Sequence, residues 1–224
     1  MPVYVVIVAG GQGMRMGSAL PKQFLPVGGK PILFHTISAF VKALPQAQII
    51  LVLPEHEISK LQMVLQHFPE RIDMNVVSGG ATRFDSVKNG LKDIPKNSIV
   101  LVHDGVRPFI SDSLIRRSIK GAEEYGAVIP AIHVTDSIRM FVDEGESVPV
   151  DRNKLRAIQT PQAFQSNILL QAFAQEYKLE FTDEATVVES MGIKVRMIEG
   201  DRNNIKITTP EDLIQAENIL IQKI

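Results

Sequence analysis

An alternation of short apolar runs with helix-like segments constrains the fold of this chain more than any other feature. The segments between the runs have helical spacing, and over residues 55–68 one face collects Ile58, Leu61, Val64 or Leu65, and Phe68. Strand and helix in turn predict an α/β fold with a Rossmann-like, mostly parallel sheet and helices on both faces. The runs are rich in β-branched residues, as buried parallel strands are, and they occupy residues 3–8, 48–54, 74–78, 98–103, 127–132 and 194–200.

Length and charge limit the classes of protein that fit. A chain of 224 residues is long enough for one large domain, so we expect a single domain over 1–224. The net charge is −1, with 24 basic and 25 acidic residues, so no overall field attracts nucleic acid or anionic lipid. Any recognition of phosphate must therefore be local.

The absence of cysteine excludes disulfides, thiolate zinc sites and a cysteine nucleophile, and it fits a reducing compartment. No stretch approaches the roughly 20 apolar residues that a membrane-spanning helix needs. We therefore expect a soluble, cytoplasmic protein without a membrane or nucleic-acid partner.

Two helix starts and one hairpin are marked by their local chemistry. Thr209 is a predicted N-cap for a helix over 209–220, with Pro210 in its first turn, and a similar helix over 182–192 is closed by Gly192. Residues 133–152 break the alternation and have hairpin chemistry. A lone two-stranded arm has too little core to hold itself, so we expect it to protrude and to lie on a second copy of the chain.

The stretch 8–24 combines flexible backbone with positive charge. Glycines follow the first apolar run, and Arg15 and Lys22 stand in a segment without an acid. Backbone N–H groups of Ala9 to Gly13, beside two cations, suit a polyphosphate. The dinucleotide fingerprint would need glycine at Met16, and a P-loop is absent. The alternative is a turn that merely joins strand to helix.

The combined motifs resemble a known family. Residues 8–17 and 21–32, VAGGQGMRMG and PKQFLPVGGKPI, are similar to the signature of the nucleotidyltransferase superfamily. Together with the segments below, they resemble the 2-C-methyl-D-erythritol 4-phosphate cytidylyltransferases of non-mevalonate isoprenoid biosynthesis, in order and over nearly the whole chain. The segments are GGATRFDSV (79–87), VHDGVRPF (102–109), DRNKLRAIQTPQ (151–162), TDEA (182–185) and RNNIKITTPED (202–212).

The resemblance implies transfer of a cytidylyl group. CTP and 2-C-methyl-D-erythritol 4-phosphate would give 4-diphosphocytidyl-2-C-methyl-D-erythritol and pyrophosphate, with Mg²⁺ bridging the triphosphate oxygens. No residue is assigned as a metal ligand. Two alternatives stay open: a ribitol-5-phosphate cytidylyltransferase, and a non-catalytic nucleotide-binding module on the same fold.

The resemblance also implies a CTP site. The backbone of Ala9 and Gly10, with Gly80 and Ser86, would contact the cytosine ring, and the family often has an acid where this chain has Ala81. The alternative for Ser86 is a solvated side chain at a helix N-terminus. The whole predicted CTP site comprises Ala9, Gly10, Gly11, Gly13, Gly80, Ser86 and Asp104.

For the acceptor phosphate, the resemblance implies Asp104, Arg107, Ser137, Arg152, Thr160 and Lys206. The predicted catalytic groups are the cations Arg15, Lys22, Arg152 and Lys206, because the obstacle is bringing two anions together. In the family the arm reaches across a homodimer, so Ser137 and Arg152 would serve the partner's site. Without the resemblance, Arg152 and Lys206 would be ordinary surface cations, and Asp104 with Arg107 a surface pair. His103 is expected to be packed rather than catalytic.

Overall fold

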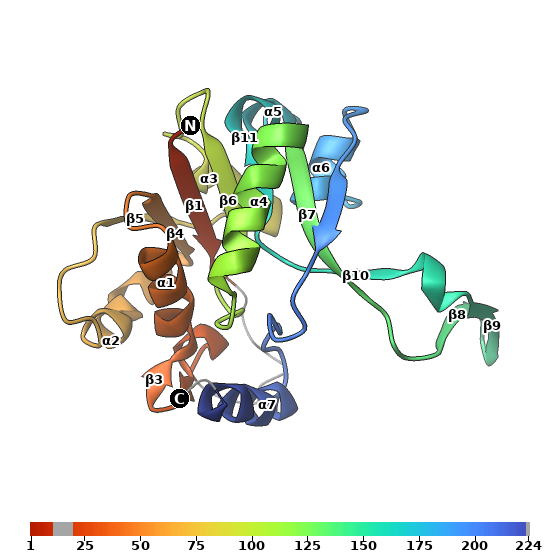
Figure 1. Ribbon diagram of the computed structural model, residues 1–224, viewed down its shortest axis with the longest axis horizontal. Helices are drawn as coiled ribbons and strands as arrows, with labels where there is room; N and C mark the ends of the chain where they lie inside the picture. Colours follow the sequence, from red (N-terminus) through yellow and green to blue (C-terminus); the bar gives the residue numbers. More distant parts are fainter. Residues whose placement is uncertain (11–19, 223–224) are drawn as a thin grey trace.

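The structure is a computed structural model that describes residues 1–10 and 20–222. Its centre is an eight-stranded sheet in the order β10-β7-β11-β6-β1-β4-β5, with β12 also paired to β7 (Figure 1). Strands β6, β1, β4 and β5 are mutually parallel, as are β7 and β12, whereas β10 and β11 run antiparallel to their neighbours. The strands are β1 (Val3–Val8), β4 (Gln48–Leu53), β5 (Met74–Ser78), β6 (Ile99–Asp104), β7 (Ala127–His133), β10 (Arg156–Ile158), β11 (Gln162–Gln165) and β12 (Arg196–Glu199).

Helices cover both faces of this sheet, because side chains alternate along each buried strand. On one face, Val5 and Ile7 of β1 pack with α1 (Ile32–Ala43) and α4 (Asp112–Tyr125). On the other face, Val6 packs with α3 (Arg83–Gly90), α5 (Ser166–Ala172) and α6 (Glu184–Glu189). The predicted α/β class, the mostly parallel sheet and the helices on both faces are therefore confirmed.

A smaller apolar cluster lies beyond the carboxyl ends of the strands. The C-terminal helix α7 (Pro210–Ile221) packs there on the short hairpin of β2 (Pro26–Val27) and β3 (Lys30–Pro31). Thr209 caps α7 as predicted, since its side chain accepts a hydrogen bond from the Asp212 N–H. This cluster fixes the elements that flank the site described below.

The predicted hairpin is present as β8 (Ile138–Asp143) and β9 (Glu146–Val150), a separate two-stranded sheet. Figure 1 shows it protruding from the body of the molecule. Phe141 at its tip is 71% exposed, and Met140 and Val142 are more than half exposed. Such an apolar surface on a two-stranded arm is consistent with the predicted contact to another chain.

Two local predictions differ from the structure. Residues 55–68 form a 3-10 helix, η3 (Glu55–Leu61), followed by one α-helical turn, α2 (Gln62–Leu65), rather than a continuous α-helix. The predicted helix over 182–192 begins after the cap Asp183 and ends at Glu189, before Gly192. In the described residues, no helix is long and apolar enough to cross a membrane.

Candidate active site

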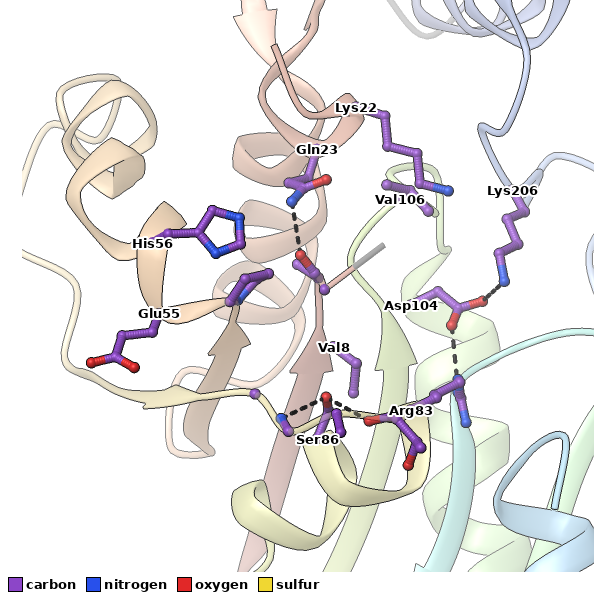
Figure 2. Close-up of a pocket in the computed structure, with 17 residues that line it drawn as sticks. Val8, Lys22, Gln23, Glu55, His56, Arg83, Ser86, Asp104, Val106 and Lys206 are labelled. Carbon is purple, nitrogen blue, oxygen red and sulfur yellow. Dashed lines mark hydrogen bonds and ion pairs between the residues drawn. The ribbon is translucent and has the colours of Figure 1, made fainter. Parts of the chain in front are cut away.

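A cavity of about 580 Å³ opens where the parallel strands β1, β4, β5 and β6 end. Carboxyl ends of parallel strands meet at one sheet edge, which is where open α/β sheets bind ligands. Figure 2 shows Lys22 and Lys206 extending toward the same side of this cavity. The lining residues are Val8, Ala9, Gly10, Lys22, Gln23, Pro54, Glu55, His56, Gly79, Gly80, Ala81, Thr82, Arg83, Ser86, Asp104, Val106 and Lys206.

The turn after β5 forms one wall. Ser86 is 6% exposed, so it is not the solvated residue of the alternative interpretation. Its hydroxyl donates to the Thr82 carbonyl at 2.9 Å and accepts from the Gly80 N–H at 3.1 Å. A Cβ at Gly80 would lie 2.3 Å from that of Asp85, so this close turn needs glycine. The wall therefore presents backbone polar groups beside a rigid helix start.

The opposite wall carries Lys22 on a buried polar support. Gln23 is completely buried, and its amide donates to the Ala9 carbonyl at 2.9 Å and to the Glu57 carboxylate. The Ala9 N–H donates to the Val52 carbonyl at 2.9 Å, so both backbone groups of Ala9 already have protein partners. Burial raises the pKa of Glu57, while nearby His56 and the Gln23 amide oppose that shift. Gln23, the residue next to Lys22, thus ties the backbone at Lys22 to the end of β1.

Asp104, the last residue of β6, is the electrostatic centre of the site. Its carboxylate lies 3.0 Å from Lys206 Nζ, 3.3 Å from Arg107 Nε and 3.5 Å from Arg83 Nη2. Burial would raise the pKa of Asp104, but the three cations outweigh it and hold that pKa well below its ordinary value. Asp104 and Arg107 are 7% and 8% exposed, so they are not a surface pair.

A buried ion pair that we did not predict supports this centre. Arg83 forms a bidentate pair with Glu184 of α6, whose side chain is completely buried. Glu184 and Asp104 outweigh the effect of burial and raise the pKa of Arg83. The cations Arg83, Arg107 and Lys206 therefore face the carboxylates of Asp104 and Glu184. These five side chains carry one more positive than negative charge. Arg83 and Glu184 both stand in segments quoted above, GGATRFDSV and TDEA, and each directly follows a helix cap, Thr82 or Asp183, but neither was assigned a role.

The segment that carries Lys206 is held by buried polar contacts. The Asn204 carbonyl accepts from Arg107 Nη1 at 2.8 Å, and the Asn204 amide donates to the Thr160 carbonyl at 2.7 Å. The Thr160 hydroxyl lies 3.1 Å from both the Asp104 nitrogen and His103 Nδ1. Arg107 and Thr160 thus lie beneath Asp104, and their direct contact with an acceptor stays a prediction.

The structure brings some predicted site residues together and leaves others apart. Lys22, Lys206 and Asp104 line one cavity, together with Ala9, Gly10, Gly80 and Ser86. Ser137 and Arg152 are exposed at the base of the arm, and neither is among the cavity-lining residues of its own chain. The predicted residues Gly11, Gly13 and Arg15 lie outside the described part of the chain.

The cavity offers limited means to hold a divalent metal. Within the described residues, no three His, Asp or Glu side chains are grouped as a metal site. Mg²⁺, however, keeps several waters and leans on substrate phosphates with one or two carboxylates. Asp104, which lines the cavity beside the end of β1, fits the role of such a single carboxylate ligand.

A Rossmann-like sheet with cations around a cavity at its carboxyl edge is the arrangement of α/β proteins that bind phosphorylated ligands. The family model for 2-C-methyl-D-erythritol 4-phosphate cytidylyltransferase matches residues 3–222. The chain therefore belongs to the 2-C-methyl-D-erythritol 4-phosphate cytidylyltransferase family.

Individual relatives agree over nearly the full chain. It is 50% identical over 209 residues to a 2-C-methyl-D-erythritol 4-phosphate cytidylyltransferase of Bacteroides thetaiotaomicron, which covers 93% of this chain and 95% of the relative. A solved 4-diphosphocytidyl-2C-methyl-D-erythritol synthase of Anaerococcus prevotii has a TM-score of 0.82 at 31% identity, covering 98% of this chain and 96% of the other. The enzyme of Thermus thermophilus has a TM-score of 0.78 at 34% identity, covering 98% of both chains.

Proposed function

We propose that two sets of cations divide the work of cytidylyl transfer in this enzyme. As a member of its family, the chain joins CTP to 2-C-methyl-D-erythritol 4-phosphate and releases pyrophosphate. Lys22 and Arg15 act on the triphosphate, and Lys206 and Arg152 act on the acceptor phosphate. The observation that carries this proposal is that Lys22 and Lys206 line one cavity, with Lys206 already aimed at an anionic oxygen of Asp104.

The chemistry needs charge stabilisation rather than acid–base catalysis. An oxygen of the acceptor phosphate attacks the α-phosphorus of CTP, and the bond to the β-phosphate oxygen breaks as pyrophosphate leaves. The acceptor phosphate is already ionised at neutral pH, so no general base is required. Lys22 stabilises the charge that develops on the α-phosphate, and Lys206 orients the nucleophile.

Asp104 presents Lys206 before substrate arrives. A carboxylate in contact with an ammonium group holds it in one direction and lowers the cost of ordering it later. Arg83 and Arg107 keep Asp104 ionised when Lys206 turns to a phosphate, because both remain beside its carboxylate. Mg²⁺, which Asp104 fits as a single ligand, would neutralise triphosphate charge when bound.

The cytosine ring would lie along the turn after β5. The Ser86 hydroxyl accepts from the Gly80 N–H and donates to the Thr82 carbonyl, so it holds the backbone of this turn in one conformation against which a base would be read. A site of this kind selects a pyrimidine, because a wrong base leaves its polar groups unpaired. Ala81 supplies no carboxylate to this wall, so selection depends on the backbone.

Assays with alternative acceptors test the function directly. CTP, Mg²⁺ and 2-C-methyl-D-erythritol 4-phosphate should give pyrophosphate, and ribitol 5-phosphate should give little. Preference for ribitol 5-phosphate would establish the sister activity instead. A chain that retains CTP and releases no pyrophosphate with either acceptor would be a binding module.

We further propose a cytoplasmic homodimer of single-domain chains, in which Ser137 and Arg152 serve the site of the partner. Both residues lie at the base of the protruding arm, whose tip exposes Phe141. An arm that packs on a second chain would bury this surface and carry Arg152 toward that chain's cavity.

Arg152→Ala should lower kcat/KM for the acceptor about 10- to 100-fold and leave the Kd for CTP nearly unchanged, because it removes charge-assisted hydrogen bonds to one phosphate only. Steady-state kinetics and CTP titration measure the two effects. Arg139→Ala is the matched control, since Arg139 lies on the same arm and bonds only to Ser147 in the described residues. Equal loss for both substrates would contradict the division.

Co-expression of two impaired variants tests whether Arg152 acts across the dimer. In a heterodimer of Lys22→Ala and Arg152→Ala chains, sharing across the interface leaves one of the two sites complete. Random assembly makes about half of the dimers mixed, so about a quarter of the wild-type rate at low acceptor concentration should return. If Arg152 serves its own chain, no complete site forms and the activity stays at the mean of the two variants. The same mixture distinguishes the two arrangements without a structure of the dimer.

A further inference from the structure

His103 lies one residue before Asp104, and its imidazole is completely buried. The ring packs edge-on against Phe40 of α1, with 4.9 Å between the ring centroids. The hydrogen-bond partners of its two nitrogens indicate which nitrogen donates and which accepts.

The donors around this ring determine the direction of each hydrogen bond. His103 Nε2 lies 3.1 Å from the Arg107 carbonyl oxygen, which only accepts, so Nε2 carries the proton. The Thr160 hydroxyl oxygen accepts from the Asp104 N–H at 3.1 Å. The hydroxyl then donates its own hydrogen bond to His103 Nδ1, which lies 3.1 Å away and accepts it. A continuous chain runs from the Asp104 nitrogen through Thr160 and His103 to the Arg107 carbonyl.

This series of hydrogen bonds holds both ends of the turn 104–107, the Asp104 N–H and the Arg107 carbonyl. The Arg107 N–H closes the turn by donating to the Asp104 carbonyl at 3.1 Å. The turn carries the carboxylate that lies 3.0 Å from Lys206 Nζ. If these hydrogen bonds were lost, the turn could shift, and Lys206 would lose its fixed direction.

We infer that His103 is a positioning residue for the acceptor side of the transfer: it fixes the turn that carries Asp104 and thereby orients Lys206. This inference rests on the proposed function in that Lys206 holds the acceptor phosphate. His103 itself is completely buried and touches no substrate.

Three variants remove the two bonds of the ring separately. His103→Asn places an acceptor near Nδ1 and keeps the bond from Thr160, His103→Gln places a donor near Nε2 and keeps the bond to Arg107, and His103→Phe removes both. We expect His103→Phe to lower kcat/KM for the acceptor by up to about 10²-fold with little change in KM for CTP, and the other two to lose less. His35→Gln, which removes a half-buried ring bonded to the Val27 carbonyl, is the control and should leave both values unchanged.

A double-mutant cycle tests the route through Thr160. His103→Phe combined with Thr160→Val should cost little more than the worse single change, because both break one chain of bonds. Additive losses in acceptor kcat/KM would overturn the inference. Equal losses in kcat/KM for CTP and for the acceptor, in proportion to the fraction of folded protein, would do the same. An acceptor kcat/KM within about twofold of wild type for His103→Phe would also overturn it.

Nitrogen NMR of the substrate-free protein reads the hydrogen bonds themselves. His103 should be the neutral tautomer with the proton on Nε2, and Thr160→Val should shift its Nδ1 resonance. A proton on Nδ1 would overturn the inference. This readout remains decisive if His103→Phe does not fold. It also separates the two proposals, since a wild-type protein inactive with the acceptor would refute the function and leave the NMR result unaffected.

Discussion

Lys22→Ala is expected to lower the rate of pyrophosphate release about 10²- to 10³-fold at saturating CTP and acceptor. A preorganised cation at the cavity wall stabilises charge that develops only in the transition state, and removing one such group has effects of this size. Lys22 lines the cavity next to the fully buried Gln23, so its backbone position should survive the change. Quenched-flow or coupled assays of pyrophosphate measure the rate.

The control for this change is Lys30→Ala. Lys30 lies on β3, outside the lining of this cavity, with its ammonium 4.6 Å from the centre of the Phe34 ring. The control should retain near wild-type turnover, which would show that loss of one nearby positive charge is not sufficient. Unaltered turnover in both Lys22→Ala and Lys22→Gln would rule out the assigned role of Lys22.

Breaking the buried pair of Arg83 and Glu184 should have the largest effect on stability. Arg83→Gln leaves the Glu184 carboxylate, whose side chain is 0% exposed, without its counter-charge. The expected loss in free energy of unfolding is about 3 kcal/mol, the lower end for buried pairs, because the Arg83 side chain is itself 32% exposed. Chemical denaturation with a shared m-value measures the loss.

The pH dependence of that loss gives a second measurement. Burial raises the pKa of Glu184, an effect that Arg83 opposes in the native protein. In Arg83→Gln, the folded state therefore binds a proton more tightly than the unfolded state. The contribution of Glu184 protonation to the free energy of unfolding is greatest below the ordinary carboxyl pKa, and it falls as the pH rises through the raised pKa. The deficit of the variant should therefore shrink on acidification.

Two further variants make this prediction specific. Replacing Arg83 and Glu184 together by methionine should cost much less stability than Arg83→Gln, because no buried charge is left without a partner. Arg116→Gln breaks an exposed pair with Asp112, at 2.8 Å, and should have no measurable effect. A similar small effect for Arg83→Gln and Arg116→Gln would show that the Arg83 pair is not structurally important.

Local pattern was sufficient to predict six strands of the central sheet and the capped start of α7. All six apolar runs form strands of the central sheet. Burial on both faces makes β4, β6 and β7 apolar at successive residues, whereas β5 and β12 are mostly half-buried or exposed. Thr209 and Pro210 predict the start of α7 for an equally local reason, since a cap bonds within its own first turn.

Where several conformations satisfy one pattern, prediction was weaker. The spacing of three between Ile58, Leu61 and Val64 suits a 3-10 helix as well as one face of an α-helix, and Glu55–Leu61 is 3-10. Strands β10 and β11 were not predicted. They pair antiparallel with β7 and β6, and they supply hydrogen-bond partners for the backbone of those strands. This pairing is set by the neighbouring strands, so the sequences of β10 and β11 alone do not indicate it.

The sequence by itself determined the fold class and the edge of the sheet at which the cavity lies, with Lys22 and Lys206 in its lining. Only the tertiary structure decided how the charges pair. Arg83 meets Glu184 across 101 positions in the chain, and His103, expected only to be packed, bonds to Thr160 across 57. Apolar periodicity is a local property of the chain, whereas the energy of a buried charge depends on the distance and burial of its partners, which exist only once the chain has folded.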